Sequence, residues 1–137
     1  MQPNPRTDDI DTLIARFYSV FDNRTGACAG VDEIASLFHE AGVIALRGAG
    51  GFQACSPIEF ATPRVDLLRG GRLTGFHEWE TAHESRVDGD LALRTSRYEK
   101  AGTMDGAPYA GKGTKFFQFI RMQGRWRILS LAWVDDE

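Results

Sequence analysis

The chain has 137 residues, of which 42% are hydrophobic and 26% charged, and its formal net charge is -3. This is enough chain for one domain with its own core, and it is too apolar for a disordered segment. The basic residues are scattered, which argues against a nucleic-acid-binding surface. No apolar run approaches the ~18 residues of a membrane span, and the segment 1–6 is polar, unlike a signal peptide. We therefore expect one soluble, cytoplasmic domain over 1–137 with a flexible N-terminus over 1–6, and neither a nucleic-acid nor a membrane partner.

The chain contains two cysteines, Cys28 and Cys55. A small secreted protein held together by disulfides would contain more. We expect both thiols to be reduced, although a single bridge between them is geometrically allowed.

Helical periodicity dominates the first half of the chain. Apolar residues at 10, 13, 14, 17 and 21 form one stripe of a helix predicted over 7–22, and a short helix is predicted over 32–39. A short strand over 43–47 and a flexible glycine-rich segment over 48–51 follow. Ser56, Pro57 and Glu59 form a capping-box pattern, so a third helix starts there and ends at Gly70. Pro63 predicts a bend or break inside it.

From residue 73 onward the pattern is that of strands. Predicted strands cover 76–86, 91–100, 112–122 and 125–134, and Asp88-Gly89, Asp105-Gly106 and Gln123-Gly124 mark tight turns between them. Consecutive strands joined in this way form an antiparallel meander. Helices followed by a run of strands indicate an α+β domain.

This order of elements resembles the NTF2-like superfamily, including its SnoaL-like and ketosteroid-isomerase-like branches. The resemblance covers nearly the whole chain, through Ser36-Leu37-Phe38 to the closing segment Gly124-Arg125-Trp126-Arg127. It implies a cone, in which N-terminal helices pack on the concave side of a curved antiparallel sheet and leave an apolar pocket. It also implies a homodimer that pairs through the sheet. The tyrosine of the isomerase branch is replaced by Phe17, and its general-base aspartate has no counterpart in the strand over 43–47, so steroid isomerisation is not expected.

Both faces of the last two predicted strands are apolar. One face of the third strand carries Phe116, Ile120 and Met122 and the other Phe117 and Phe119, while in the fourth Trp126 and Ile128 oppose Leu129, Leu131 and Trp133. A sheet with one face in water should alternate apolar and polar residues. The pattern therefore favours a second subunit over the outer face, the alternative being cover by the chain's own helices or loops.

Histidine supplies the first candidate for chemistry, because it titrates near neutral pH. His77, Trp79 and His83 share one face of the strand over 76–86, opposite Glu78, Glu80 and Glu84. Burying three carboxylates is costly, so we expect the histidine face to point inward and His77 to be the catalytic base. Phe76 lies on the carboxylate side, however, and a bulge would shift the register. A hydrogen-bonded His77 without a catalytic role is the alternative.

A metal site is not expected. The six residues between His77 and His83 span about 20 Å of strand, which is too far for two ligands of one ion.

Two further polar residues are candidates for ligand binding. Arg97 follows Leu91, Leu93 and Thr95 on one strand face, which would carry it inward toward a carboxylate or an anionic ligand, unless its head reaches water at the strand end. Gln118 lies between Phe116 and Ile120, where its amide could orient a ligand or satisfy a backbone group.

The sequence thus predicts a homodimeric protein that binds a small, largely apolar molecule of unknown identity between the first helix and the sheet, without a cofactor. The predicted ligand-binding walls are Phe17, Phe21, Trp79 and Phe117, and the predicted polar groups are His77, His83, Arg97 and Gln118. A cyclase, isomerase or dehydratase reaction would suit such a pocket. The alternative is a non-catalytic dimeric binding or protein-interaction module of the same fold.

Overall fold

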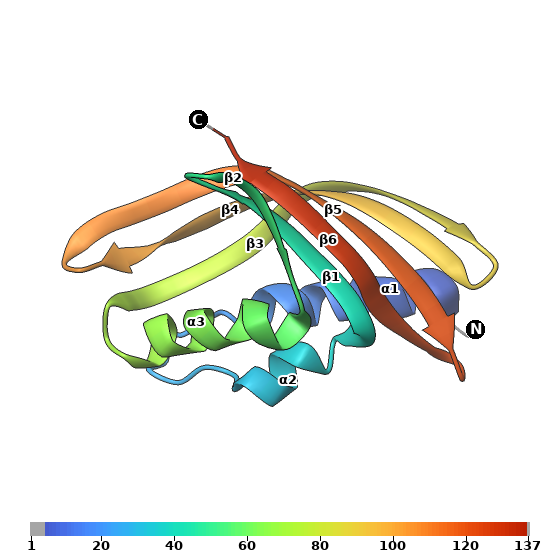
Figure 1. The fold of residues 1–137 in the computed structure, drawn as a ribbon, viewed down its shortest axis with the longest axis horizontal. Helices are drawn as coiled ribbons and strands as arrows, with labels where there is room; N and C mark the ends of the chain where they lie inside the picture. Colours follow the sequence, from blue (N-terminus) through green and yellow to red (C-terminus); the bar gives the residue numbers. More distant parts are fainter. Residues whose placement is uncertain (1–4, 137) are drawn as a thin grey trace.

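The computed structural model describes residues 5–136, with the side chains of 5–8 left outside the description. Three helices lie on one side of a curved six-stranded sheet whose strand order is β2-β1-β6-β5-β4-β3 (Figure 1). All neighbouring strands are antiparallel except β1 and β6, which run parallel. This is the predicted α+β architecture. The elements are α1 (Pro5–Ser19), α2 (Val31–Ala35), β1 (Phe38–Gly48), β2 (Gly51–Cys55), α3 (Pro57–Arg69), β3 (Leu73–Asp88), β4 (Leu91–Met104), β5 (Ala107–Met122) and β6 (Arg125–Asp135).

Helix α1 buries the stripe predicted from its periodicity. All five apolar residues of the stripe, from Ile10 to Phe21, are buried. Phe17 packs edge-on against Phe117 of β5, with ring centroids 5.2 Å apart. The helix begins at Pro5, inside the segment 1–6 that was expected to be flexible, whereas residues 1–4 lie outside the described residues.

The segment between α1 and α3 departs most from the prediction. Helix α2 ends at Ala35 rather than at 39, and β1 already begins at Phe38. The glycines of 48–51 form the turn of a hairpin, and its second strand, β2, was not predicted. A five-residue helix and a five-residue strand are too short to show a clear hydrophobic period, which is why the sequence pattern missed both boundaries.

Helix α3 has the predicted capping box. Glu59 N–H donates to Ser56 Oγ at 3.2 Å, and Ser56 N–H donates to Glu59 Oε1 at 2.9 Å. A break at Pro63 is wrong, because the helix continues from Pro57 to Arg69 with Pro63 inside it. Burial of Phe60, Ala61, Val65 and Leu68 against the sheet and α2 offsets the backbone hydrogen bond that a proline removes.

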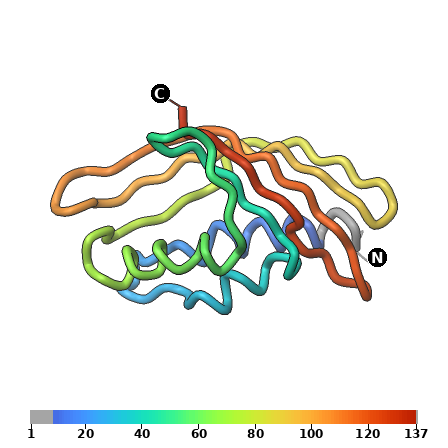
Figure 2. The backbone as a smooth tube through the Cα atoms, viewed as in Figure 1, coloured from blue at the N-terminus to red at the C-terminus, as the bar shows by residue number. Residues whose placement is uncertain are grey.

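Strands β3 to β6 form the predicted meander. Its β4–β5 and β5–β6 turns fall at the predicted residues, and its β3–β4 turn lies at Gly89 and Asp90, one residue later than predicted. Asp105 and Gly106 both have positive φ, as a type I′ turn requires. The β4–β5 turn and the β3–β4 turn project at opposite ends of the molecule (Figure 2). Among the described residues, none of the helices has the length and apolar character to cross a membrane. Cys28 and Cys55 are not bonded to each other.

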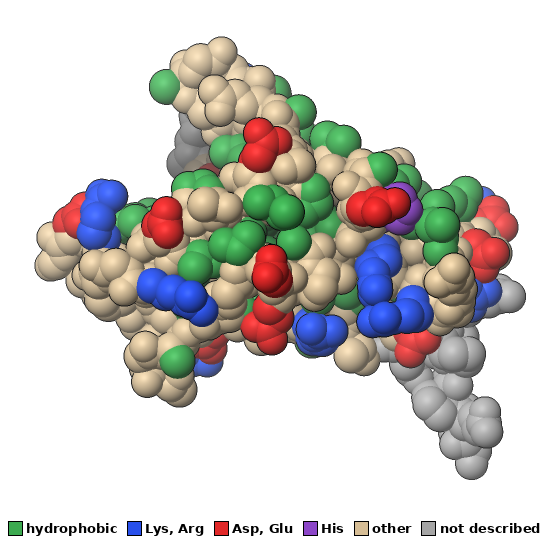
Figure 3. Space-filling model, turned by 60° about the horizontal axis from the view of Figure 1, so that its bottom comes forward, with side chains coloured by type: hydrophobic (Ala, Val, Ile, Leu, Met, Phe, Trp, Pro, Cys, Tyr) green, Lys and Arg blue, Asp and Glu red, His purple; other side chains and the backbone are tan. Residues whose placement is uncertain are grey.

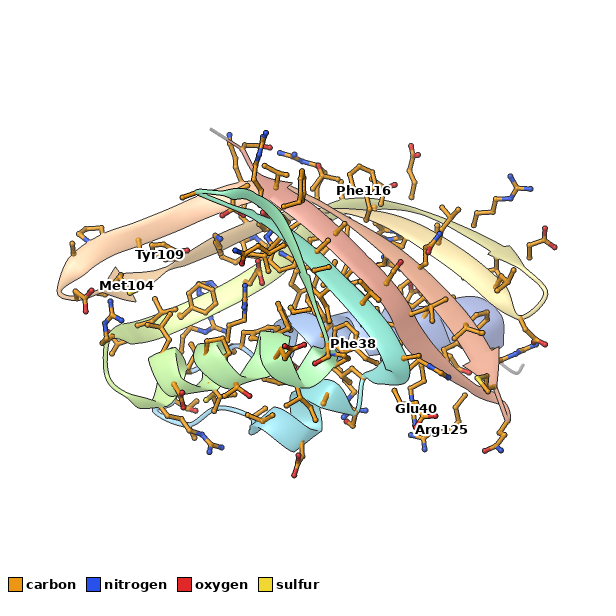
Figure 4. All side chains as sticks on the ribbon, viewed as in Figure 1. Phe38, Glu40, Met104, Tyr109, Phe116 and Arg125 are labelled. Atoms are coloured by element: carbon orange, nitrogen blue, oxygen red, sulfur yellow. The ribbon has the colours of Figure 1, made fainter. Side chains whose placement is uncertain are left out.

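The strand register decides which residues face the helices. On the inner face, which the helices cover, β4 places Arg94, Ser96 and Tyr98, and β5 places Lys115 and Phe117. The outer face carries Leu93, Thr95 and Arg97 of β4 with Phe116 and Gln118 of β5. In Figure 4, Phe116 points away from the helices and Phe38 lies between them and the sheet.

Strand β6 corrects one predicted face. Ile128 and Leu131 were expected on opposite faces, but both are buried. Phe119 pairs with Ile128, and the next residue back, Gln118, pairs with Ser130. The bulge at Leu129 therefore shifts the alternation by one residue.

One buried side chain joins three elements below the sheet. Asn23 follows α1, and its Nδ2 donates to the carbonyl oxygens of Leu68 at 3.0 Å and Leu73 at 2.7 Å. Its Oδ1 accepts from Phe76 N–H at 2.7 Å. Asn23 thereby fixes the end of α1 against the end of α3 and the start of β3.

Replacing this side chain tests the junction. Asn23→Ala leaves two carbonyls and one N–H buried without their partner, so we expect the free energy of unfolding to fall by about 2–4 kcal/mol. Urea denaturation followed by circular dichroism measures the change. Ser19→Ala is the control, because its hydroxyl makes only an exposed bond to the Arg16 carbonyl at 3.0 Å, and it should stay within ~0.5 kcal/mol of the wild type. An Asn23→Ala protein as stable as the control would contradict this role.

Candidate functional site

A cavity of about 310 Å³ lies between α1, α3 and the inner face of the sheet. Its size is in the range of small-molecule sites. Figure 3 shows the helix-bearing side of the molecule, where hydrophobic side chains gather near the centre and charged ones surround them. The apolar walls of the cavity are Phe17, Phe21, Phe60, Pro63, Leu67, Leu68, Leu73, Phe76 and Trp133, and its polar residues are Arg64, Glu78, Lys100, Tyr109 and Lys115.

Lys115 is the most deeply buried charged group of the cavity, with 2% of its surface exposed. Its Nζ donates to Glu78 Oε2 at 2.7 Å and lies 3.3 Å from the centroid of the Tyr98 ring. Burial lowers the pKa of the Lys115 ammonium to about 8, and the neighbouring Glu78 carboxylate limits that fall. An amine with such a pKa is partly neutral near physiological pH.

Lys100 lies on the same cavity wall in a different environment. Its Nζ donates to Asp135 Oδ2 at 2.8 Å, and Tyr98 Oη donates to the other oxygen of the same carboxylate. Burial disfavours the Lys100 ammonium, but the hydrogen bond and charge of Asp135 outweigh it, so the pKa lies above its ordinary value. Lys100 is therefore a fixed positive charge.

Two glycines of β5 make room for these side chains. A Cβ at Gly113 would lie 2.6 Å from Tyr98 Oη, and one at Gly111 would lie 2.8 Å from Lys100 Cε. Both glycines stand on the inner face, two and four residues before Lys115. Side chains at these positions would occupy the space that Tyr98 and Lys100 now fill.

Arg64 enters the cavity from α3 as a cation without a carboxylate. Its guanidinium lies 4.1 Å from the Phe60 ring centroid and 5.7 Å from that of Trp133. Its Nη1 donates to the Phe60 carbonyl at 3.1 Å. Among residues 5–136, none of the described carboxylates forms an ion pair with it. Burial lowers the pKa of Arg64, but a guanidinium still stays charged in proteins.

A separate, fully paired network lies beside α1. Arg94 donates through Nη1 to Asp11 Oδ1 at 2.6 Å and through Nη2 to Glu80 Oε1 at 2.5 Å. Ser96 Oγ donates to the other carboxylate oxygen of Glu80. It also forms a hydrogen bond of 2.7 Å with Tyr18 Oη. Burial raises the pKa of Tyr18. This network ties α1 to β3 and β4 and leaves no charge free for a ligand.

The predicted orientation of β3 is wrong. Glu78 and Glu80 face inward, whereas His77 and Trp79 lie on the opposite side of the strand, with stacked rings 4.5 Å apart and Trp79 37% exposed. Arg94 on the neighbouring strand β4 and Lys115 on β5 offset the cost of burying the carboxylates. A bulge between Glu80 and Ala82 then changes the alternation, and His83 is exposed.

The other predicted ligand-binding residues separate into three places. Phe17 and Phe21 line the cavity, and Phe117 lies in the core against Phe17. Arg97 lies on the outer face rather than inside, where it donates to Thr114 Oγ1 at 2.8 Å and Asp136 Oδ2 at 3.0 Å. Gln118 is also on the outer face and accepts from Ser130 Oγ at 2.8 Å.

His77 borders a groove between α1 and β3, apart from the cone cavity. Its Nδ1 is buried and makes no hydrogen bond within the described part of the chain. A catalytic role for His77 stays a prediction.

The charged residues of the cavity were missed by the sequence reasoning. Lys115 carried a usable signal, because it precedes Phe117 and Phe119 by two and four residues and therefore shares their face. No comparable sequence pattern marks Arg64, because its position in the cavity depends on how α3 lies across the sheet.

No protein-family model and no curated protein sequence matches the chain. Solved structures do match it. A protein described provisionally as a calcium/calmodulin-dependent kinase II association domain, from Exiguobacterium sibiricum, is 12% identical with a TM-score of 0.77, over 100% of this chain and 98% of that one. An NTF2-like protein from Cytophaga hutchinsonii is 12% identical with a TM-score of 0.71, over 98% and 100% of the two chains. Hexachlorocyclohexane dehydrochlorinase LinA-type3 from Novosphingobium barchaimii is 16% identical with a TM-score of 0.72, over 96% and 87%.

These likenesses extend over almost all of each chain, although the identities are low enough to speak for the fold alone. The element order, the curved sheet and the cavity between the helices and the inner face agree with them. The chain therefore has the NTF2-like cone fold that its sequence resembles.

Proposed function

We propose that the cone cavity binds a small organic anion with an apolar, ring-bearing body. The observation that carries this proposal is Arg64, a partly buried cation on the cavity wall that has no carboxylate partner among the described residues. A guanidinium in this position costs less free energy when an anion satisfies its donors, and a carboxylate matches its planar fork.

The charge balance around the cavity supports an anionic ligand. Lys115 is paired with Glu78, and Lys100 is paired with Asp135. Each of these two ion pairs has no net charge, so the positive charge of Arg64 is the net charge of the cavity lining. A neutral or cationic ligand would leave that charge uncompensated.

The walls supply the apolar part of the recognition. Phe17, Phe21, Phe60 and Trp133 present aromatic rings to the cavity, and a ring-bearing ligand would bury its faces against them. A structural neighbour named for hexachlorocyclohexane, an apolar ring compound, supports a cyclic body for the ligand. A proton-transfer reaction such as isomerisation or dehydration in this cavity would use Lys115 and Glu78, because His77 lies outside it.

Ligand titration of a charge-deleted variant tests the anion site. We expect 4-methylbenzoate to bind and its neutral analogue, 4-methylbenzamide, to bind at least tenfold more weakly, measured by isothermal titration calorimetry. Arg64→Gln should weaken benzoate binding by about 10- to 100-fold, which corresponds to the ~1.5–3 kcal/mol of a charged hydrogen bond.

Arg69→Gln is the matched control for this experiment. Arg69 lies on the same helix but is exposed and makes only a 3.3 Å bond to the Cys28 carbonyl. Its replacement should leave the affinity unchanged. Equal binding of acid and amide by the wild type would contradict the proposal.

We also propose that the protein is a homodimer paired through the outer face of the sheet. The outer apolar patch consists of Val43, Leu93, Phe116 and Val134, which are 48%, 48%, 59% and 38% exposed. The register places these residues on adjoining rows of four neighbouring strands. An apolar patch of this kind on a sheet face is typical of an interface, and a neighbour described provisionally as an association domain agrees with oligomer formation.

A charge in the middle of the patch tests the dimer. Phe116→Glu should convert the dimer to a monomer by placing carboxylates against apolar side chains of the partner, as measured by size-exclusion chromatography with multi-angle light scattering. Ile58→Glu is the control, because Ile58 is 57% exposed but lies on α3, away from the patch. A monomeric wild type would contradict the dimer and favour the interaction-module alternative, in which another protein covers this face.

A further inference from the structure

We infer that Lys115 is a nucleophilic amine that forms an imine with the carbonyl carbon of an aldehyde or ketone held in the cone cavity. The substrate class is a carbonyl compound that bears both an apolar ring and a carboxylate. The placement of that carboxylate rests on the anion site proposed above. The reactivity of the amine does not.

The first argument is the position of the Lys115 amine. Its Nζ lies on the cavity wall rather than at the surface, and its stem crosses the Tyr98 ring to reach Glu78. Glu78 is almost as buried as Lys115, with their side chains 9% and 3% exposed. An amine that reaches a cavity of about 310 Å³ beside a carboxylate has both a substrate volume and a proton acceptor.

The second argument is the contrast between the two lysines of the cavity. Lys100 is held as an ammonium by Asp135, which itself accepts from Tyr98. Lys115 has only Glu78, and its burial favours the neutral amine that attacks carbonyl carbon. Lys100 therefore keeps its proton, whereas Lys115 releases its proton more readily and then offers a lone pair.

The step balances with groups already present. The Lys115 ammonium transfers a proton to the Glu78 carboxylate, and the neutral nitrogen attacks the carbonyl carbon to form a C–N bond. A second proton from nitrogen passes to the former carbonyl oxygen, which gives a carbinolamine. Glu78 returns its proton as the C–O bond breaks, water leaves and the protonated imine forms. No oxidant, reductant or metal is consumed.

The third argument is that one small molecule can reach both Arg64 and Lys115. Both face the same ring of Trp133, Arg64 Cζ at 5.7 Å and Lys115 Nζ at 5.1 Å from its centroid. Their separation is thus no greater than the sum of these two distances. A benzene ring with a carboxylate at one end and an aldehyde at the other suits this span, with its face against Trp133.

The reaction should depend on pH through Lys115 and the groups that face it. At a pKa of about 8, raising the pH from 7 to 9 should increase the trapping rate about tenfold, followed by a plateau. An ordinary lysine with a pKa near 10.4 would show a rise of roughly 100-fold over the same interval without a plateau. The charged and titratable groups around Lys115 are Glu78, Tyr98, Lys100, Tyr18 and Asp135.

Reductive trapping tests the inference on the full-length protein. The protein is incubated with 4-carboxybenzaldehyde, quenched with sodium borohydride and analysed by intact mass and peptide mapping. The chain has only three lysines, Lys100, Lys112 and Lys115, so peptide mapping separates the modified lysine from the other two and from the α-amine of the chain. We expect one adduct per chain, on Lys115.

Matched variants separate the nucleophile from the fold. Lys115→Arg keeps the positive charge beside Glu78 and should lose at least nine-tenths of the adduct. Lys112→Arg, at an exposed position of the same strand β5, should retain it. If Lys115→Arg does not fold, peptide mapping of the adduct on the wild-type protein still shows whether Lys115 is the nucleophile.

Two further probes distinguish this inference from the anion site. An adduct with 4-methylbenzaldehyde on Lys115 without binding of 4-methylbenzoate supports the nucleophile and overturns the proposed anion site. Binding of 4-methylbenzoate without a Lys115 adduct from either aldehyde overturns the nucleophile and keeps the anion site. Adducts spread over the three lysines, with a rate that rises through pH 10, also overturn the inference.

Discussion

The ion pair between Lys115 and Glu78 is the interaction on which the site depends. It spans from β5 to β3 across the intervening strand β4 and passes over the face of Tyr98. Breaking one partner of a buried pair leaves an uncompensated charge, which is more costly than the pair itself is favourable. The charged residues on the inner face of β3 to β5 therefore depend on one another, because each buried carboxylate needs a cation from another strand.

That dependence explains where the sequence reasoning succeeded and failed. The stripe of α1, the capping box of Ser56 and the three meander turns are local features, and each was predicted from the residues that form it, the β3–β4 turn to within one residue. The orientation of β3 was not local. Three glutamates on one strand face indicate solvent when that strand is considered alone, but the cations that neutralise Glu78 and Glu80 come from positions 14 to 37 residues away.

Bulges account for the remaining errors in the strands. Periodicity assumes that faces alternate without interruption, whereas β3 shifts between Glu80 and Ala82 and β6 shifts at Leu129. Leu131 was placed on the wrong side for this reason, whereas the bulge in β3 brings His83 opposite Ser96 on the predicted inner face, where it is exposed. Phe17 and Phe21, two of the predicted walls, line the cavity: the period of 3.6 residues holds along α1, and Phe21 stays buried in the turn after Ser19. Their role in ligand binding stays a prediction.

On β4 and β5 several charged and polar side chains face the helices, whereas apolar side chains are exposed on the outer face. The glycines of β5 are one physical reason for this arrangement. Gly111 and Gly113 leave space on the inner face that Lys100 and Tyr98 occupy, so the cavity near the β4–β5 end is lined by polar groups. The outer face, with Leu93 and Phe116, is more apolar than the inner face at the same level. Charged groups and exposed apolar side chains therefore lie on opposite faces of the same two strands, β4 and β5.

The two lysines of the cavity have pKa values shifted in opposite directions, although they lie in the same cavity. Both are buried, and burial disfavours the ammonium of each. Asp135 approaches Lys100 while accepting from Tyr98, so its charge is well stabilised and it holds the proton on Lys100. For Lys115, burial is the main cause that lowers the pKa to about 8; Glu78 and Asp135 oppose this fall, and the charge of Lys100 adds to it. The charge that Asp135 fixes on Lys100 is thus one of the causes of the reactivity we assign to Lys115.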